Sequence, residues 1–415
     1  MRLLLYTGKG GVGKTTMAAA TAAVAARRGS RTLVLSADIA HSLADVFDEP
    51  LSATPRTLAP GLDALEVDAR QVIESHWGRV HSYLVDLFRH QGIEEVVAEE
   101  LVLLPGAEEL ATLACVDEWA ASGHYDLIVV DCAPTGSTLR LVTLPEVASH
   151  SLRWLLRLQR AAASVAEPIV RGWVDAPLPS AEVFAEADRL LYKTLHRLHV
   201  RLLSRDTSVR LVVTPESMVI DEARRSLTDL SLFQLASDAV VMNRMLPGEA
   251  LREPFFEQWG RTQAERLREV ARVFSPMACL ISPLQPDEVR GVEALAQHGE
   301  LLFADRDPAA RLGESVRLRF ERDARGARVR LPLPGLDPAT LEVARVADEL
   351  VVAVAGRRRK IALPTGFAKL EVERVAIRDD ELLISFADPD GVDGCDPVRR
   401  RPASFAAASG GGGVA

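Results

Sequence analysis

The chain has 415 residues, 48% of them hydrophobic, which is enough for two or three domains with a sizeable core. Its formal net charge of -9 argues against a protein that coats DNA or RNA, so we expect no nucleic acid partner. Four widely spread cysteines include no C-x-x-C pair, which favours neither a disulfide framework nor a zinc or iron–sulfur site. No apolar run is long enough to span a bilayer, and no signal sequence opens the chain, so we expect a cytoplasmic protein that is not transmembrane.

A short apolar run at residues 3–6 leads into a glycine-rich stretch and then into an alanine-rich helix. Residues 8–15 match the phosphate-binding pattern G-x-x-x-x-G-K-[ST], in which backbone N–H groups turn inward onto a polyphosphate. Lys14 would supply a charge to the terminal phosphates, and the hydroxyl of Thr15 would bind Mg²⁺ directly. The predicted nucleotide-binding residues of this loop are Gly8, Lys9, Gly10, Gly11, Val12, Gly13, Lys14, Thr15 and Thr16.

The next elements predict an α/β domain over residues 1–305. A helix at 16–28 and a strand at 31–36 complete a βαβ unit with the first strand, so the sheet should be mostly parallel. Further buried strands are predicted at 62–67, 126–131, 209–214, 238–243 and 277–282, with helices at about 220–232 and 253–273. Two stretches of helical periodicity interrupt them, at about 69–122 and 146–205, and predict an inserted helical subdomain.

Three polar residues follow predicted strands at the edge where parallel sheets bind ligands. Asp38 could orient the attacking water, although an aspartate in this place is often only a helix cap. Asp131 ends its strand where P-loop enzymes keep a carboxylate that holds Mg²⁺ through water, and we expect Asp38 to contact the metal in the same indirect way. Asn243 could bond a purine edge or could simply be a turn residue.

After about residue 325 the pattern changes to short, closely spaced strands without intervening helices. The runs lie at 329–334, 349–355, 358–363, 370–376 and 381–386, and they predict a small all-β sandwich over 327–388. The proline-, glycine- and arginine-rich tail at 389–415 should be disordered.

These motifs together resemble those of the ArsA family of arsenite-pump ATPases, whose eukaryotic members target tail-anchored membrane proteins. The resemblance covers about residues 1–305 and rests on Lys9, on the segments 38–45 and 131–140, and on 282–295. The region 327–388 is similar to the α-crystallin-like domain appended to many bacterial members. The resemblance implies ATP and Mg²⁺ as cofactors, and it implies that Asn243 reads adenine and that Asp131 orders the Mg²⁺ site.

The resemblance also implies catalytic roles for Asp38, Lys9 and Lys14. Asp38 would activate water, and Lys9 would reach across a nucleotide-dependent homodimer to the phosphates of the partner.

Departures from the family pattern bear on function. Ile39 replaces a usual proline, and Cys132 and Ser137 replace a usual threonine and histidine. The chain has one ATPase unit and lacks both the metalloid-binding cysteines and the zinc-binding C-x-x-C of relatives, so we do not expect arsenite transport. The leading interpretation is a dimeric ATPase whose hydrolysis gates a client or membrane-associated partner protein. The alternatives are a partitioning or positioning ATPase, and a nucleotide-binding chaperone module without significant turnover.

Overall fold

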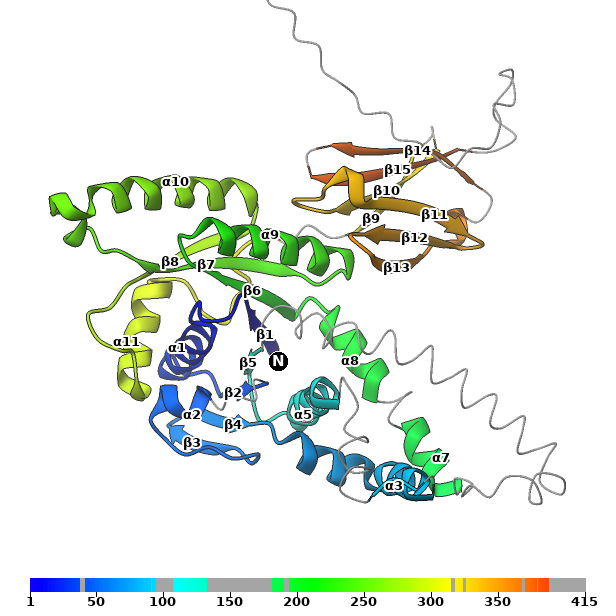
Figure 1. Cartoon of the computed structure of the whole chain (residues 1–415), viewed down its shortest axis with the longest axis horizontal. Helices are drawn as coiled ribbons and strands as arrows, with labels where there is room; N and C mark the ends of the chain where they lie inside the picture. Colours follow the sequence, from blue (N-terminus) through cyan, green and yellow to red (C-terminus); the bar gives the residue numbers. More distant parts are fainter. Residues whose placement is uncertain are drawn as a thin grey trace, which may run out of the picture.

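A parallel sheet forms the centre of the molecule. The computed structural model describes residues 1–37, 42–90, 92–94, 107–132, 181–189, 194–314, 318–323, 326–367, 370–378 and 380–387. Within these residues the large sheet has the strand order β3-β4-β2-β5-β1-β6-β7-β8 (Figure 1). Its strands are β1 (Arg2–Thr7), β2 (Thr32–Ser36), β3 (Arg56–Ala59), β4 (Leu62–Glu66), β5 (Leu127–Asp131), β6 (Thr207–Val213), β7 (Ser237–Met245) and β8 (Ala278–Pro283).

Neighbouring strands of this sheet run parallel except for β3, which pairs antiparallel with β4 at one edge. The central strands β1, β5 and β6 are buried along nearly their whole length because helices cover both faces. The predicted P-loop type of fold with a mostly parallel sheet is therefore confirmed. The edge strand β3 was not predicted.

Helices pack on both faces of the sheet (Figure 1). On one face α1 (Lys14–Arg27) packs against α11 (Gly291–Phe303) and the short α2 (Ser42–Phe47), and on the other lie α9 (Ser217–Leu232) and α10 (Glu257–Val273). The alanines of α1 allow α11 to approach closely: a Cβ added to Gly299 would lie 2.6 Å from the carbonyl oxygen of Ala20. Short 3-10 turns, η3 (Ala250–Arg252) and η4 (Pro254–Phe256), precede α10.

The helical stretches beside the sheet are described in part. The first contains α3 (Ala69–His90) and α5 (Ala107–Ser122), and the second contains α7 (Ala181–Asp188) and α8 (Leu195–Leu202). Helix α3 bends at Trp77, and the Glu186 carboxylate of α7 accepts hydrogen bonds from the backbone N–H groups of Arg79 and Val80 just after the bend. Residues 133–180 lie outside the described part, so most of the second predicted stretch is not assessed. None of the described helices combines the length and apolar character needed to cross a membrane.

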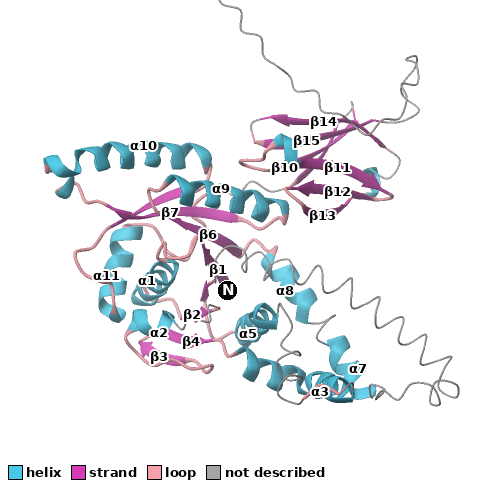
Figure 2. Cartoon of the chain, viewed as in Figure 1, coloured by secondary structure: helices cyan, strands magenta, loops and turns pink. Residues whose placement is uncertain are grey.

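The C-terminal part is all-β (Figure 2). Its strands are β9 (Arg319–Asp323), β10 (Gly326–Pro332), β11 (Leu341–Val346), β12 (Glu349–Val354), β13 (Arg357–Ala362), β14 (Glu371–Arg378) and β15 (Glu381–Ala387), with two short turns, η5 (Pro338–Thr340) and η6 (Thr365–Phe367). They form two antiparallel sheets, β14-β15-β10-β9 and β11-β12-β13, around a core of their own. Strands β9 and β11 were not predicted, and β9 lies upstream of residue 327. The tail predicted at 389–415 lies outside the described residues.

The sandwich docks on the C-terminal half of α9. Leu232 joins the apolar core of the sandwich, and Arg359 of β13 donates to the Leu232 carbonyl. Arg357 Nη1 lies 2.5 Å from Asp229 Oδ2, and the hydroxyl of Thr228 donates to the carbonyl of Pro334. Apolar contact, ion pair and hydrogen bonds therefore hold the two parts together.

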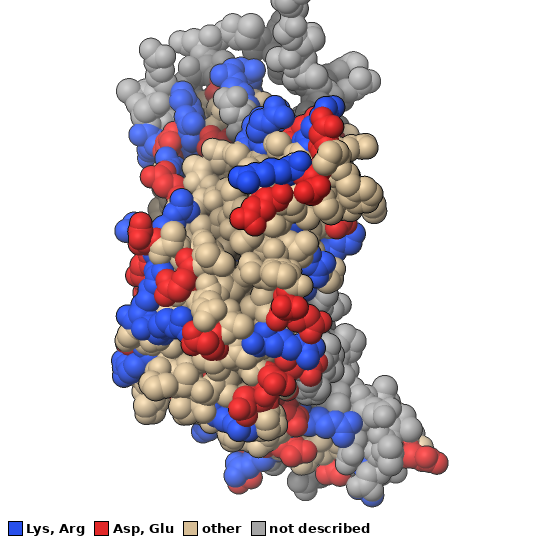
Figure 3. All heavy atoms as spheres, turned by 90° about the vertical axis from the view of Figure 1, so that its left-hand side faces the viewer, with Lys and Arg blue, Asp and Glu red and all other residues tan. Residues whose placement is uncertain are grey.

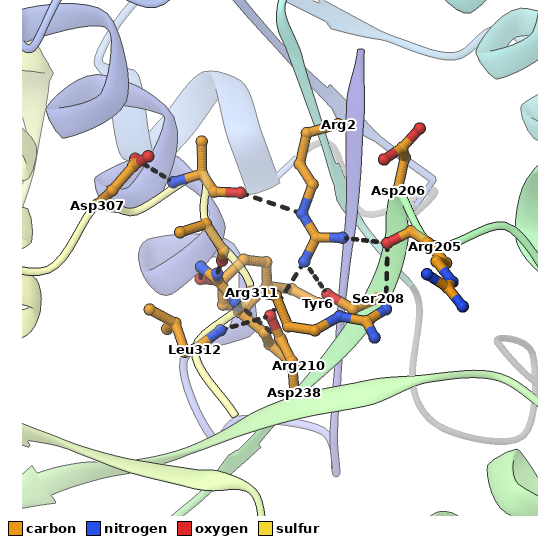
Figure 4. A network of polar contacts seen from close by, with 12 residues as sticks. Arg2, Tyr6, Arg205, Asp206, Ser208, Arg210, Asp238, Asp307, Arg311 and Leu312 are labelled. Atoms are coloured by element: carbon orange, nitrogen blue, oxygen red, sulfur yellow. Dashed lines mark hydrogen bonds and ion pairs between the residues drawn. The ribbon is translucent and has the colours of Figure 1, made fainter. Parts of the chain in front are cut away.

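A buried polar network lies at the amino-terminal ends of β6 and β7 (Figure 4). The fully buried carboxylate of Asp238 pairs with Arg2 at 3.0 Å and with Arg210, also fully buried, at 3.3 Å. Arg210 donates in addition to the Tyr6 hydroxyl and to a backbone carbonyl, and the backbone N–H of Leu312 donates to Asp238. Because Leu312 follows α11, the network ties the end of the α/β part to its own sheet.

Candidate functional site

The glycine-rich loop joins β1 to α1 and is fixed at both ends. A Cβ on Gly8 would lie 2.4 Å from the carbonyl oxygen of Val212 in β6, and one on Gly13 would lie 2.4 Å from Asn243 Nδ2. Gly13 also has a φ of +91°, which disfavours other residues. In contrast, apart from their chain neighbours, no atom of the described residues lies within 4 Å of a Cβ built on Gly10 or Gly11. The loop is therefore held at its ends and open in its middle, as a cradle for a ligand must be.

The first turn of α1 carries the two residues predicted to act on phosphate and metal. Lys14 is buried, and its Nζ donates to the carbonyl of Lys9 at 3.3 Å. The hydroxyl of Thr15 lies 3.1 Å from the hydroxyl of Ser42, which opens α2. Ser42 follows directly on residues 38–41, which are outside the described part, so Asp38 has no described position.

Asp131 ends β5 between the two strands that precede the predicted phosphate and water-positioning residues. It is in register with Tyr6 of β1 and with Ser36 of β2, and its side chain is fully buried. The structure therefore brings this carboxylate to the carboxyl edge of the sheet beside β1, and its role in holding Mg²⁺ through water stays a prediction. The loop motif that follows it, at 133–140, lies outside the described residues.

Lys9 sits inside the loop with its side chain partly exposed. Its Nζ lies 3.9 Å from Glu222 Oε2 on the second turn of α9. Sequence reasoning did not single out Glu222, because a glutamate on a solvated helix carries no local signal of such a contact.

Asn243 lies in β7 and is committed to hydrogen bonds around the loop. Its Nδ2 donates to the Val12 carbonyl at 2.8 Å, and its Oδ1 accepts from Ser282 Oγ of β8 at 2.8 Å. Ser282 Oγ in turn lies 2.9 Å from His298 Nε2 of α11, and burial lowers the pKa of this imidazole. Ser282 and His298 were not predicted. A histidine on the buried, otherwise apolar face of a helix, near Leu295 and Leu302, was the available signal.

A cavity of about 460 Å³ borders the loop. One wall is the start of α1 with Gly13 and Thr16, another is Asn243 with Arg244, and a third is the segment 283–290 between β8 and α11. The cavity is large enough for a nucleoside. The predicted role of Asn243 as an adenine reader stays a prediction, since its amide also supports the loop.

The oxygen donors at this edge suit Mg²⁺, which prefers a few protein oxygens together with water and substrate phosphates. Thr15 offers a hydroxyl and Asp131 a buried carboxylate on neighbouring elements. In the part of the chain that the structure describes, no group of three or more His, Cys, Asp or Glu side chains forms a separate metal site.

Comparison with known proteins agrees with this geometry. A family model described as anion-transporting ATPase (ArsA) matches residues 1–304, and a model described as an HSP20-like domain found in ArsA matches residues 324–386. A protein of Aquifex aeolicus named "Putative arsenical pump-driving ATPase 1" is 34% identical over 394 residues, which cover 92% of this chain and 99% of that protein.

Two further relatives extend the comparison. A protein of Chlorobaculum tepidum named "Putative arsenical pump-driving ATPase" is 32% identical, over 93% of this chain and 96% of its own length. "ATPase ASNA1 homolog 1" of Paramecium tetraurelia is 26% identical, over 73% of this chain and 92% of its own. Since one model spans most of the chain and the alignments with two relatives above 30% identity cover nearly all of it, the chain belongs to the ArsA ATPase family and is an ATPase with a C-terminal HSP20-like domain.

Proposed function

We propose that the chain is a Mg²⁺-ATP-dependent ATPase whose hydrolysis gates a homodimer that handles a partner or client protein. The glycine-rich loop supports this most directly. Its ends contact β6 and Asn243, its middle is open among the described residues, and it borders a cavity large enough for a nucleoside. In this proposal the phosphates bind over Gly10 and Gly11, and the nucleoside enters the cavity beside Asn243.

The proposed chemistry is positioning and charge stabilisation, because phosphoryl transfer to water requires little covalent help. Lys14 leaves the Lys9 carbonyl to contact the terminal phosphates, and Thr15 holds Mg²⁺ through its hydroxyl. Asp131 and Asp38 would hold the metal through water, and Asp38 would orient the attacking water. Mg²⁺, when bound, neutralises charge that develops on the phosphate oxygens.

The dimer is supported by the face that carries the loops after β7 and β8, at the left of Figure 1. Figure 3 shows an uncharged stretch across the middle of this face, with charged clusters above and below it. Four large apolar side chains in segments that follow β6, β7 and β8 are exposed: Met218, Phe255, Trp259 and Leu284. An uncharged face with exposed apolar side chains suits contact with a second copy of the chain. That contact would bring Lys9 to the partner's phosphates.

We propose partner handling rather than arsenite transport, although the names of two relatives refer to an arsenical pump. The chain contains one ATPase motif and no cysteine pair, and Cys115 and Cys132 are buried. Turnover should therefore be insensitive to arsenite. Stimulation of turnover by arsenite would reverse this choice.

The central test compares ATP turnover of the wild-type protein with that of Asp38→Asn. The variant should bind ATP and lose turnover, because an amide orients water poorly and cannot take part in the charge balance of the metal site. Asp305→Asn, at an exposed aspartate after α11, is the matched control and should turn over ATP normally. If Asp38→Asn binds and hydrolyses ATP like the wild type, the role given to Asp38 is wrong.

The client is tested by crosslinking in the ATP-trapped state, with Asp38→Asn as the trap. Recovery of hydrophobic membrane-protein segments would support partner handling of the targeting kind. Recovery of DNA would favour the partitioning alternative, and recovery of no protein at all would contradict the proposal. Recovery of clients by a chain that does not turn over ATP would favour the chaperone-module alternative.

A further inference from the structure

We propose that Asn243, Ser282 and His298 form a relay that holds one peptide group of the phosphate loop in its binding orientation. Ser282 and His298 are thus positioning residues for nucleotide phosphates, although neither touches them. This inference rests on the proposed phosphate site, and it adds residues from β7, β8 and α11 to that site.

The hydrogen-bond pattern fixes the direction of every donor in the relay. Asn243 has two distinct ends: its Nδ2 donates to the Val12 carbonyl, and its Oδ1 accepts from Ser282 Oγ, both at 2.8 Å. A serine hydroxyl has only one hydrogen, so Ser282 Oγ must accept its remaining bond, at 2.9 Å, from His298 Nε2–H. The pattern therefore assigns the Nε2–H tautomer to His298.

The other imidazole nitrogen agrees with this assignment. His298 Nδ1 is buried and has no hydrogen-bond partner among the described residues. An unprotonated nitrogen tolerates such a position better than an N–H or a charged imidazolium, which would lose its hydration. His298 is therefore a neutral donor with one fixed direction.

The bond to Val12 has a geometric consequence for the next residue. A peptide group is planar and trans, so the C=O of Val12 and the N–H of Gly13 point in opposite directions. When Asn243 holds the carbonyl, the Gly13 N–H is directed away from Asn243. In a loop that binds phosphate through backbone N–H groups, this decides whether that donor faces the ligand.

The peptide needs an external constraint because a glycine follows it. Rotation of this peptide changes ψ of Val12 and φ of Gly13, and Gly13, with a φ of +91°, adopts either sign of φ with little cost. A rotation of the Val12–Gly13 peptide would thus meet small local resistance. The amide of Asn243 opposes this rotation, because it packs so close to Gly13 that a Cβ added there would lie 2.4 Å from Asn243 Nδ2.

Helix packing supports the far end of the relay. His298 precedes Gly299, where α11 lies so close to α1 that an added Cβ would lie 2.6 Å from the carbonyl oxygen of Ala20. Helix α1 begins at Lys14, immediately after the loop. The donor and the loop that it orients are therefore held by the same pair of packed helices, so the relay spans a rigid frame.

The relay and base reading make different predictions for the same residues. A residue that reads adenine discriminates ATP from GTP, because only the base differs. A residue that orients a loop N–H changes affinity for the shared phosphates, so ATP, GTP and inorganic tripolyphosphate should all be affected by the same factor.

The experiment measures the dissociation constants of ATP, GTP and tripolyphosphate with Mg²⁺ for the wild type, Ser282→Ala, His298→Leu and His298→Gln. Ser282→Ala and His298→Leu should weaken all three ligands about fivefold to tenfold, the effect of losing one hydrogen bond. The Nε2 of glutamine can donate from nearly the same place as His298 Nε2, so His298→Gln should recover most of the affinity lost in His298→Leu. Ser237→Ala is the matched control, since Ser237 is a buried serine at the opposite end of β7 with no partner for its hydroxyl among the described residues.

Each outcome decides between explanations. The relay is wrong if Ser282→Ala binds all three ligands as tightly as the wild type. It is also wrong if Ser237→Ala loses as much affinity as Ser282→Ala, because that result would indicate a general effect of sheet stability. A loss of affinity for ATP alone would identify the residues as base readers instead. If His298→Gln binds the ligands as weakly as His298→Leu, His298 does not act through its N–H donor. Failure of the wild type itself to bind ATP would overturn the proposed function first, and the relay with it.

Discussion

Lys9 Nζ lies 3.9 Å from Glu222 Oε2, so the second lysine of the phosphate loop rests against α9 of its own chain. The side chains are 38% and 33% exposed, and the distance is at the limit of an ion pair. Partly exposed pairs of this kind are weak. Lys9 can therefore leave Glu222 at small cost, as it must if it is to reach the phosphates of a second copy.

We expect Lys9→Ala to leave ATP binding by the monomer nearly intact and to abolish dimer-dependent turnover. Glu222→Gln should have the opposite effect, because it removes the charge that competes for Lys9, and should raise the fraction of dimer at a given protein concentration. Sedimentation velocity with a non-hydrolysable ATP analogue and turnover at several protein concentrations measure both effects. Lys360→Ala, at an exposed lysine of the sandwich paired with Glu349, serves as the control. Unchanged turnover in Lys9→Ala would exclude the role of this lysine across a dimer.

Much of the fold was predictable because its signals are local. Buried strands such as β5 contain continuous apolar runs, here residues 127–130, and the loop motif specifies both its glycines and the helix after it. Strands β3, β9 and β11 were missed because they are short or carry charged residues, so only their pairing with a neighbour defines them.

The site divides in the same way. Lys14, Thr15 and Asp131 belong to contiguous motifs, so the sequence alone identifies them as candidates. Glu222, Ser282 and His298 are 213, 39 and 16 residues away from the partners that they contact, Lys9, Asn243 and Ser282 respectively. Only tertiary packing brings these pairs together, so the sequence does not show which residues pair, even where helical periodicity marks His298 as buried.

Asp238→Ala should strongly destabilise the α/β part. The substitution leaves the fully buried guanidinium of Arg210 and the nearly buried one of Arg2 without their shared carboxylate (Figure 4). Removing one partner of a buried ion pair typically costs about 3–5 kcal/mol. Urea unfolding followed by tryptophan fluorescence measures the change. Glu257→Ala, which breaks the exposed pair with Arg261, should cost less than about 1 kcal/mol, and an equal cost for the two variants would contradict the argument.

Gly299→Ala should separate α11 from α1. The added Cβ would lie 2.6 Å from the Ala20 carbonyl oxygen and 2.7 Å from Val24 Cβ, so one helix must shift. Overpacking of this kind costs about 1–3 kcal/mol, and ATP affinity should fall with it because α1 begins at the phosphate loop. Thermal unfolding and ATP binding test both effects. Gly248→Ala should change neither, because no atom of the described residues other than its chain neighbours lies within 4 Å of the new Cβ. A normal melting temperature for Gly299→Ala would rule out the close contact.

Asp229 makes the contact between α9 and the sandwich dependent on pH. Burial raises the pKa of its carboxyl to about 6, although the Arg357 guanidinium works in the opposite direction. Because an unfolded aspartate titrates near about 3.9, the folded state binds more protons between about pH 4 and pH 6. Stability should therefore fall as the pH rises through this window and stay at the lower level above it. Asp229→Asn is neutral throughout, so it should remove this component and be at least as stable as the wild type at pH 7.

Asp126 provides a control of opposite sign for that experiment. Its hydrogen bonds with the side chain of Arg31 lower the pKa of its carboxyl to about 2, so its contribution is present above about pH 4 and is lost as the pH falls toward 2. Unfolding midpoints of the wild type, Asp229→Asn and Asp126→Asn between pH 3 and pH 8 separate the two groups. The Asp229→Asn difference should appear between about pH 4 and pH 6, whereas the Asp126→Asn difference should change only below about pH 4. If Asp229→Asn and the wild type keep parallel profiles from pH 4 to pH 7, the Asp229 carboxyl titrates as it does in the unfolded chain, and the contact between α9 and the sandwich is insensitive to pH.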